Sequence, residues 1–176
     1  MTKPDAHATP TAQAVPAAQA AIKFQRRYEN ATVEDLWDLW TTKEGFESWW
    51  GPKGFRVEVH KLELREGGEL HYDMIADAPE EIAAMKKMNM PLTHATRGSF
   101  ARIQRLKHLE LIHLVDFIPG VKPYEHLIRV DFSAGGGSAE MVITVEPHHN
   151  PEWTRMATMG MESQLTKVPG VLAARR

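Results

Sequence analysis

A short aromatic segment, residues 36–55 (LWDLWTTKEGFESWWGPKGF), constrains the fold of this chain more than any other stretch. It holds four of the five tryptophans, Trp37, Trp40, Trp49 and Trp50. Aromatic side chains of this size carry a large apolar area that must be removed from water. Because so short a segment cannot bury them by itself, we expect it to pack against a larger element, namely the end of a curved sheet.

Within this segment, the residue pattern predicts two short helices followed by a tight turn. Thr32 is placed to cap the first helix, and Asp35 stands where a capping-box partner would. Thr42 is placed to cap the second helix, which Gly51-Pro52 ends because proline cannot continue a helix. The apolar positions of the first helix recur at helical spacing and are Val33, Leu36, Trp37 and Trp40.

The composition limits the classes of function. The chain has 176 residues and a formal net charge of -2, so nothing favours binding to nucleic acid or to an anionic membrane surface. It has no cysteine, which excludes disulfides, zinc-thiolate sites and thiol nucleophiles. No apolar run approaches the length of a membrane span. We therefore expect a cytoplasmic protein with one hydrophobic core.

Residues 1–20 differ in composition from the rest of the chain. They are mostly Ala, Thr, Gln and Pro, and Pro4, Pro10 and Pro16 interrupt any helix. The stretch lacks the continuous apolar core of a signal peptide. We expect a disordered tail over residues 1–20 and a single domain over residues 21–176.

Alternating apolar residues predict about seven strands. The alternation slips by one residue after Val59, which is typical of a β-bulge. The Gly135-Gly136-Gly137 run predicts a hairpin loop, and no helix follows it as a phosphate-binding loop would require. The predicted strands cover residues 22–29, 55–65, 70–74, 98–106, 108–118, 124–133 and 138–146.

Two further helices are expected. The insertion at residues 78–92 predicts a short amphipathic helix with Ile82, Met85 and Met88 on one side, either as a lid over a pocket or as a helix packed on the rim of the sheet. The last helix starts at Asn150 as its N-cap, and Pro169-Gly170 should break or kink it. Its predicted inner face comprises Trp153, Met156, Ala157, Gly160, Gln164 and Val168.

Several of these motifs together resemble a known family. Trp37 and Trp40 with Thr41, the WWGP run at 49–52 and the LREGG run at 64–68 are similar to the SRPBCC (START-like) superfamily. They resemble more closely the bacterial relatives of the activator of heat-shock protein 90 ATPase. Gly160 and Leu165 match the terminal helix of that family, whereas Met161 and His113 stand where it commonly has aromatic residues.

The resemblance implies an α+β helix-grip (birch-pollen-allergen-like) fold. In that fold a curved antiparallel sheet of about seven strands surrounds a long C-terminal helix, and two short helices follow the first strand. It also implies a hydrophobic cavity between sheet and helix. Superfamily members bind lipids, sterols or polyketides, and some catalyse cyclisation or hydrolysis. The leading hypothesis is therefore binding of a small hydrophobic or amphipathic ligand, with no cofactor.

Strand parity and the resemblance together suggest a cavity wall, although the same residues would also suit a filled core. A cyclase or hydrolase would use His113 or His126 with Tyr72 as general acid or base. The nine histidines show no metal-binding spacing, so no metal is expected. The candidate ligand-binding residues are Trp40, Tyr72, Met74, Met85, Met88, His113, Phe117, His126, Phe132, Met141, Met156 and Met159.

A third hypothesis is a co-chaperone-like or antitoxin-like interaction module. It requires an exposed apolar patch, which we would expect around the Trp49-Trp50 turn. A protein partner is therefore possible, but no sequence feature indicates one, and the oligomeric state stays open.

Overall fold

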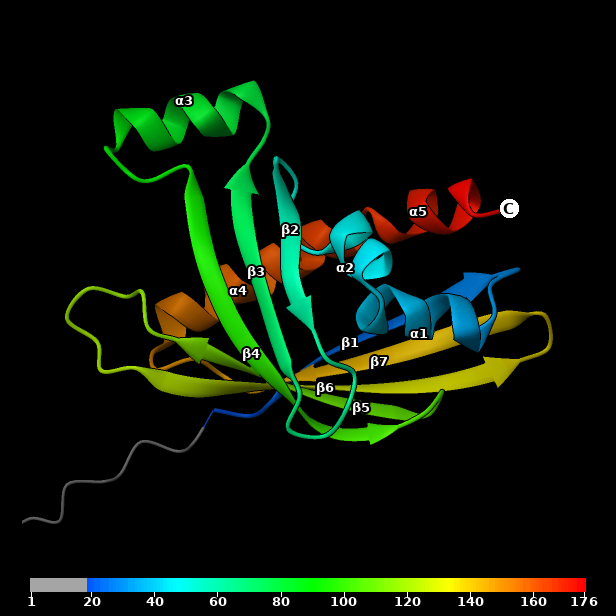
Figure 1. Cartoon of the computed structure of the whole chain (residues 1–176). Helices are drawn as coiled ribbons and strands as arrows, with labels where there is room; N and C mark the ends of the chain where they lie inside the picture. Colours follow the sequence, from blue (N-terminus) through cyan, green and yellow to red (C-terminus); the bar gives the residue numbers. More distant parts are fainter. Residues whose placement is uncertain (1–18) are drawn as a thin grey trace, which may run out of the picture.

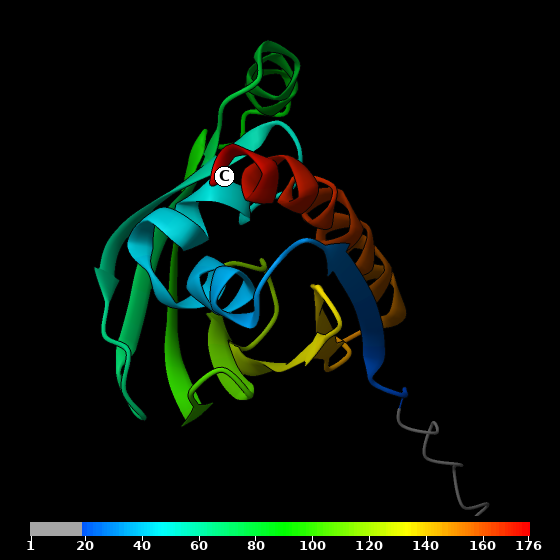
Figure 2. The ribbon, with the colours of Figure 1, turned by 90° about the vertical axis from the view of Figure 1, so that its right-hand side faces the viewer.

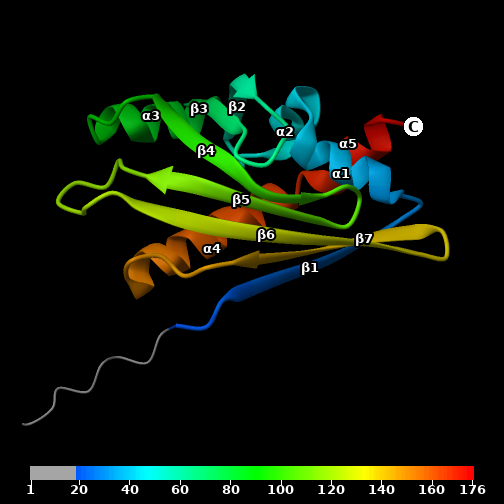
Figure 3. The ribbon, with the colours of Figure 1, turned by 60° about the horizontal axis from the view of Figure 1, so that its bottom comes forward.

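A curled antiparallel sheet of seven strands forms the frame of the molecule (Figure 1). The computed structural model describes residues 19–176, so most of the tail expected over residues 1–20 lies outside the described residues. The strands are β1 (Ile22–Glu29), β2 (Phe55–Leu62), β3 (Glu69–Ala76), β4 (Thr93–Gln104), β5 (His108–Val115), β6 (Tyr124–Gly135) and β7 (Ser138–Val145). Their order across the sheet is β1-β7-β6-β5-β4-β3-β2, part of which Figure 3 shows side by side.

The helices divide into two groups. Figure 2 shows four of them on the concave side of the sheet: α1 (Val33–Thr41), α2 (Lys43–Trp49), α4 (Pro151–Leu165) and α5 (Val168–Ala174). The fifth, α3 (Pro79–Lys87), projects beyond the ends of β3 and β4. The predicted helix-grip fold is thus confirmed.

The aromatic segment folds as its pattern predicts. Thr32 and Asp35 form a complete capping box at the start of α1, and the Thr42 hydroxyl accepts a hydrogen bond from the Gly45 amide at the start of α2. Helix α1 then packs against β6 and β7, while α2 packs against β2. The two helices therefore close one end of the concave face. We call this end the aromatic end.

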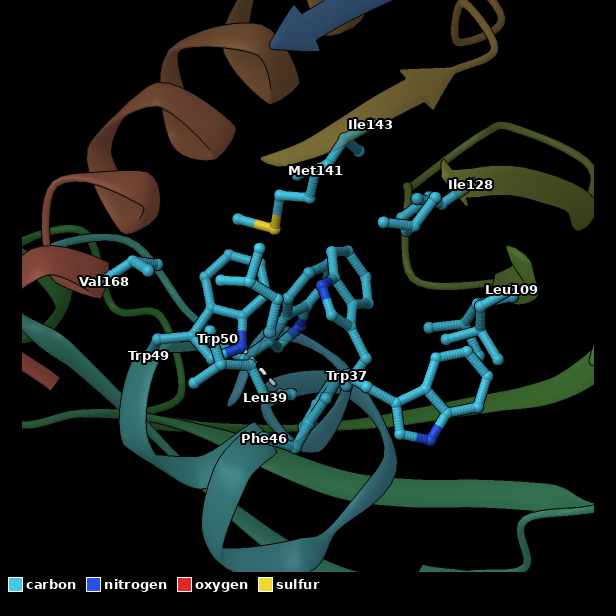
Figure 4. Packing of buried hydrophobic residues seen from close by; sticks show 14 of the residues in the cluster. Trp37, Leu39, Phe46, Trp49, Trp50, Leu109, Ile128, Met141, Ile143 and Val168 are labelled. Carbon is cyan, nitrogen blue, oxygen red and sulfur yellow. Dashed lines mark hydrogen bonds between the residues drawn. The ribbon is translucent and has the colours of Figure 1, made fainter. Parts of the chain in front are cut away.

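Aromatic rings pack closely together at this end (Figure 4). Trp40, Phe46 and Trp49 are completely buried. The rings of Trp40 and Trp49 meet edge to face with centroids 5.0 Å apart, a favourable geometry for aromatic quadrupoles. The indole N–H of Trp49 donates to the Leu39 carbonyl at 2.9 Å, so this buried polar group is satisfied.

The predicted bulge is present in β2. The register with β3 shifts between Val59 and Lys61, where the apolar alternation slips by one residue. A second shift lies in β4, between Phe100 and Arg102. Bulges increase the local bend of a strand, so these two positions help to curl the sheet around the helices.

Several boundaries differ from the prediction, for example those of β2 and β5, which each end three residues early. Two of the differences have a clear physical reason. Strand β4 begins at Thr93, five residues before the predicted start at residue 98, because it pairs with β3 along its whole first half. The last helix breaks after Leu165, so the predicted break at Pro169-Gly170 is wrong. Pro169 lies in the first turn of α5, where the missing amide N–H is no loss since that turn has no intrahelical acceptor for it.

Among residues 19–176, no helix combines the length and the apolar composition needed to cross a membrane.

Candidate functional site

A cavity of about 240 Å³ lies between the concave face of the sheet and α4, beyond the aromatic end. Its wall is predominantly apolar. Among the apolar contributors are Ile22, Phe24, Val115, Ile128, Val145 and Met161. We call this part of the molecule the cavity end.

The space exists because small residues of α4 face the sheet. Ala157 and Gly160 lie in the wall, together with Thr154 and Thr158. A Cβ atom at Gly160 would meet no atom within 4 Å. Open space therefore lies in front of this glycine.

Five of the twelve candidate ligand-binding residues line this cavity. They are Tyr72, Met74, His113, Phe117 and His126. Four of them come from β3, β5 and β6, on the strand faces that parity predicts, and Phe117 follows β5. Contact of these residues with a ligand remains a prediction.

Three other candidates belong to the aromatic end and are not in the cavity wall. Trp40 and Met141 are completely buried in the core, and Phe132 packs edge to face on Trp37 with ring centroids 5.4 Å apart. All three point inward, as expected. However, β6 and β7 run from the cavity to the aromatic end, and there the helices α1 and α2 cover them.

The four remaining candidates are methionines outside the wall. Met156 and Met159 are exposed, the latter by 60%, because the residues of α4 that face the cavity are Ala157, Gly160, Met161 and Gln164. The predicted inner face of this helix is therefore rotated by about one position.

Met85 and Met88 belong to the region of α3, which has no buried residue and contributes nothing to the cavity wall. A lid over the cavity finds no support, because no residue of α3 lines the wall. The contact of α3 with β3, and the Glu81 side chain beside Gly54, fit the other interpretation, a helix on the rim of the sheet.

A buried chain of hydrogen bonds lies where the cavity meets the aromatic end. The indole Nε1 of Trp50 donates to the Tyr72 hydroxyl at 3.0 Å. The same hydroxyl lies 3.1 Å from Nε2 of His113. The imidazole of His113 also stacks on Trp50, with ring centroids 5.8 Å apart and planes 11° apart. Burial lowers the pKa of His113 to about 3, so this imidazole is neutral at pH 7.

Two more histidines lie on the β6 side of the wall. Nε2 of His126 is 2.7 Å from the carbonyl oxygen of Glu146, and the ring stacks on His148 with centroids 3.9 Å apart. Burial lowers the pKa of His126 and, helped by the neighbouring His126 and His149, lowers the pKa of His148 to about 4. Three neutral imidazoles thus share one cavity.

A fourth histidine contributes an unsatisfied nitrogen. Nε2 of His94 is buried and has no hydrogen-bond partner within the described residues. The ring of His94 packs edge to face on Phe117, with centroids 4.3 Å apart. The hydroxyl of Tyr28 and the indole N–H of Trp40 are unpaired in the same way outside the cavity, so this nitrogen does not by itself mark a ligand site.

Sequence reasoning missed several residues of the wall. His94 lies in the part of β4 that was not predicted as strand, and His148 lies outside every predicted strand and helix. Trp50 is 6% exposed, so it is buried, as expected for the aromatic segment, whereas the interaction-module hypothesis needed it on the surface. The WWGP motif could have pointed to Trp50, whereas no sequence signal would have placed His148 against His126.

The wall carries little net charge. Its one carboxylate, Glu146, is paired with Arg129 at 2.6 Å, and no Lys or Arg lines it among the residues that the structure describes. Over the same residues 19–176, no group of three or more potential ligand side chains could hold a metal ion.

The sequence matches the family model described as Activator of Hsp90 ATPase homolog 1-like protein over residues 30–173. Among curated proteins, no sequence matches it.

Solved bacterial structures share the fold at low sequence identity. The AHSA1 protein of Silicibacter pomeroyi superposes with a TM-score of 0.69 at 16% identity, covering 89% of this chain and 100% of the other. A protein of Chromobacterium violaceum gives 0.67 at 15% identity, covering 88% and 98%. A protein of Arthrobacter aurescens gives 0.64 at 22% identity, covering 91% and 92%.

Proposed function

The chain belongs to the family of Activator of Hsp90 ATPase homolog 1-like proteins, and from this premise we propose that it binds a small, largely apolar molecule in the cavity between the sheet and α4. The observation that carries the proposal is a cavity of about 240 Å³ whose apolar wall holds buried imidazoles. Pockets that hold drug-sized ligands measure roughly 300–1,000 Å³. The ligand is therefore small, of the size of one or two fused rings or a short acyl chain.

The competing interpretation is a core that is merely packed loosely. Protein interiors resemble organic crystals and contain few voids larger than a water molecule. The aromatic end follows that rule, since its large side chains are fully buried against one another. A large void beside so dense a core, bounded by Ala157 and Gly160 of α4, supports a space kept open for a ligand.

Catalysis by the Tyr72–His113 pair is less well supported than binding. A general acid or base works best when its pKa lies near the working pH. Burial lowers the pKa of His113 to about 3 and raises the pKa of Tyr72 far above its ordinary value. Both groups therefore stay neutral near pH 7, where they can hold a ligand by hydrogen bonds but transfer protons poorly.

The interaction-module hypothesis has lost the surface on which it depended. Trp49 is 0% exposed and Trp50 is 6% exposed, so the indoles form no apolar patch. Among residues 19–176, the exposed methionines that remain are Met88 and Met90, which follow α3, and Met156 and Met159 on α4.

The proposal is tested by native mass spectrometry of freshly purified protein, followed by solvent extraction. We expect a discrete added mass that the solvent releases. Gly160→Leu should abolish it, because the new side chain grows into open cavity space. Gly170→Leu is the matched control: Gly170 also lies in a helix with open space around it, yet outside the cavity wall. If Gly160→Leu folds and retains the added mass, the molecule binds elsewhere and the proposal fails.

A further inference from the structure

The three neutral imidazoles of the cavity end differ in which nitrogen carries the proton, and the hydrogen bonds decide this. The chain of bonds at His113 begins with Trp50, whose indole N–H can only donate. The Tyr72 oxygen accepts that bond. Thr96 is a further neighbour of the Tyr72 hydroxyl, and we assign the single O–H proton of Tyr72 to Nε2 of His113, which lies 3.1 Å away. Nε2 is then the acceptor, and the proton of the neutral ring is on Nδ1.

The Nδ1 edge of His113 faces away from β4. A Cβ atom at Gly98 would lie 3.4 Å from Cδ2 of His113, so the Cδ2 edge of the ring is turned toward Gly98. The opposite edge, which carries Nδ1, is turned toward β6, where His126 is the register partner of His113. Within the described residues no protein group accepts a hydrogen bond from this N–H.

His126 has the opposite tautomer. Its Nε2 lies 2.7 Å from the Glu146 carbonyl oxygen. Because a carbonyl oxygen only accepts hydrogen bonds, Nε2 carries the proton. Nδ1 of the neutral ring is consequently a bare acceptor, and no donor within residues 19–176 reaches it.

A longer chain of hydrogen bonds orients His148. The Asn150 Oδ1 atom accepts from the Trp153 amide, so its NH₂ group donates to Nε2 of His149 at 2.9 Å. His149 then donates from Nδ1 to the Tyr124 oxygen, at 3.2 Å, and Tyr124 donates to Nδ1 of His148, at 2.6 Å. The proton of His148 is left on Nε2 as a free donor.

The cavity therefore offers two N–H donors, on His113 and His148, and one acceptor, on His126. A hydroxyl group has the complementary set, with two lone pairs and one proton. We propose that the histidines of the cavity end bind the hydroxyl group of an uncharged apolar ligand, an alcohol or a phenol. This inference rests on the proposed function and specifies the polar group of its ligand.

Charged head groups match the site poorly. A carboxylate would face the lone pair on Nδ1 of His126, and no cationic side chain lines the cavity within the described part of the chain. An ammonium group would face the N–H groups of His113 and His148. Desolvating either ion without a partner is costly, so the site selects against both.

A matched ligand series tests the inference on the unmodified protein. Naphthol, its methyl ether, naphthalene and naphthoate share one apolar frame and differ in the polar group. Isothermal titration at pH 7.5 should give naphthol roughly tenfold tighter binding than naphthalene, as expected for one or two net hydrogen bonds. The ether, which cannot donate to His126, should bind less tightly than naphthol, and naphthoate should bind least tightly.

The outcomes separate the two proposals. If naphthalene binds as tightly as naphthol, the cavity binds apolar molecules but the histidines do not recognise a hydroxyl group, and the inference is overturned. Tighter binding of naphthoate overturns it too. If no member of the series binds, both this inference and the proposed function are rejected.

Two further measurements test the assigned atoms. His126→Phe removes the acceptor and keeps a planar ring, so it should lower naphthol affinity roughly 3- to 10-fold and leave naphthalene affinity unchanged. His60→Phe, at an exposed site on β2, is the control. Nitrogen-15 NMR of the imidazoles reports the tautomers without ligand: a proton on Nδ1 of His126 would contradict the inference even if the variant fails to fold.

Discussion

The aromatic end and the cavity end are two halves of one concave face, yet one is filled and the other is hollow. The strands do not explain the difference, because β6 and β7 contribute inward-facing residues to both ends. The covering helices do. Helices α1 and α2 bring Trp37, Trp40, Phe46 and Trp49 against the sheet, whereas α4 brings Ala157 and Gly160.

The comparison shows that the size of the helix side chains that face the sheet decides where a cavity forms in this fold. The polar groups divide less cleanly. At the aromatic end, Trp49 finds a backbone acceptor within the core, but the buried indole N–H of Trp40 has no partner within the described residues. At the cavity end, nitrogens of His113, His126 and His148 are left to a bound molecule or to solvent. Variants that treat the two ends differently can therefore test this account.

The largest expected effect comes from truncating a ring of the aromatic end. Trp40→Ala should lower the free energy of unfolding by about 3–5 kcal/mol, because it leaves a void in a densely packed core. Phe117→Ala removes a ring that is 44% exposed at the cavity end and should cost less than about 1 kcal/mol. Urea denaturation measures both. Equal losses would show that the two ends are packed alike.

A smaller effect, of opposite sign at the two ends, is expected for glycine substitutions. Gly45→Ala places a Cβ atom 1.9 Å from the Asp38 carbonyl oxygen of the aromatic end, so it should destabilise the fold by about 2 kcal/mol. Gly160→Ala meets open space and removes a glycine from a helix interior, so it should stabilise by about 0.5–1 kcal/mol. Thermal unfolding distinguishes them. Destabilisation by Gly160→Ala would mean that the cavity is filled.

The last expected effect depends on pH and concerns the buried histidines. Their pKa values are lowered in the folded state, that of His113 to about 3. Between that value and the unfolded pKa of about 6.5, the unfolded chain binds more protons. Stability is therefore complete above pH 6.5 and falls as the pH decreases, by up to about 1.4 kcal/mol per pH unit for each histidine.

Variants locate the source of this pH dependence. His113→Phe should flatten the slope of stability against pH between pH 6.5 and 4, whatever it costs at neutral pH. The residual slope reflects His126 and His148, with Tyr124 and Glu146 as the polar groups that face them.

Carboxyl groups whose pKa is lowered, such as Asp35 and Glu47, add to this residual slope, whereas His108, whose pKa is raised, opposes it. An unchanged slope in His113→Phe would assign the acid sensitivity to other groups.

Much of the fold was predictable because its signals are local. Thr32 and Asp35 lie three residues apart and cap α1 as predicted. Val59 and Leu62 show the slip of the β2 bulge in the sequence itself. The resemblance carried by the WWGP and LREGG runs identified the family. The break in the last helix was misplaced because proline disrupts a helix interior but is tolerated in a first turn, and the spacing alone does not distinguish the two.

The candidate site was predictable only in part. The alternation along the strands correctly predicted that Tyr72, His113 and His126 point to the concave face. It also predicted Met141 and Phe132 as wall residues, but these two pack at the aromatic end. Met156 failed for a different reason. On this helix a rotation by one residue turns Ala157 instead of Met156, and Met161 instead of Gly160, toward the centre of the cavity side.

The sequence by itself determined the strands, the caps, the aromatic helices and the family, since each depends on residues close together in the chain. Only the tertiary structure decided which inward-facing residues meet a helix and which meet a void, and which nitrogen of each histidine carries its proton. Those properties depend on contacts between distant residues, such as His126 with His148 and Tyr72 with His113. Alternation along a strand decides to which face of the sheet a side chain points. What packs against that face depends on helices and strands far away in the sequence.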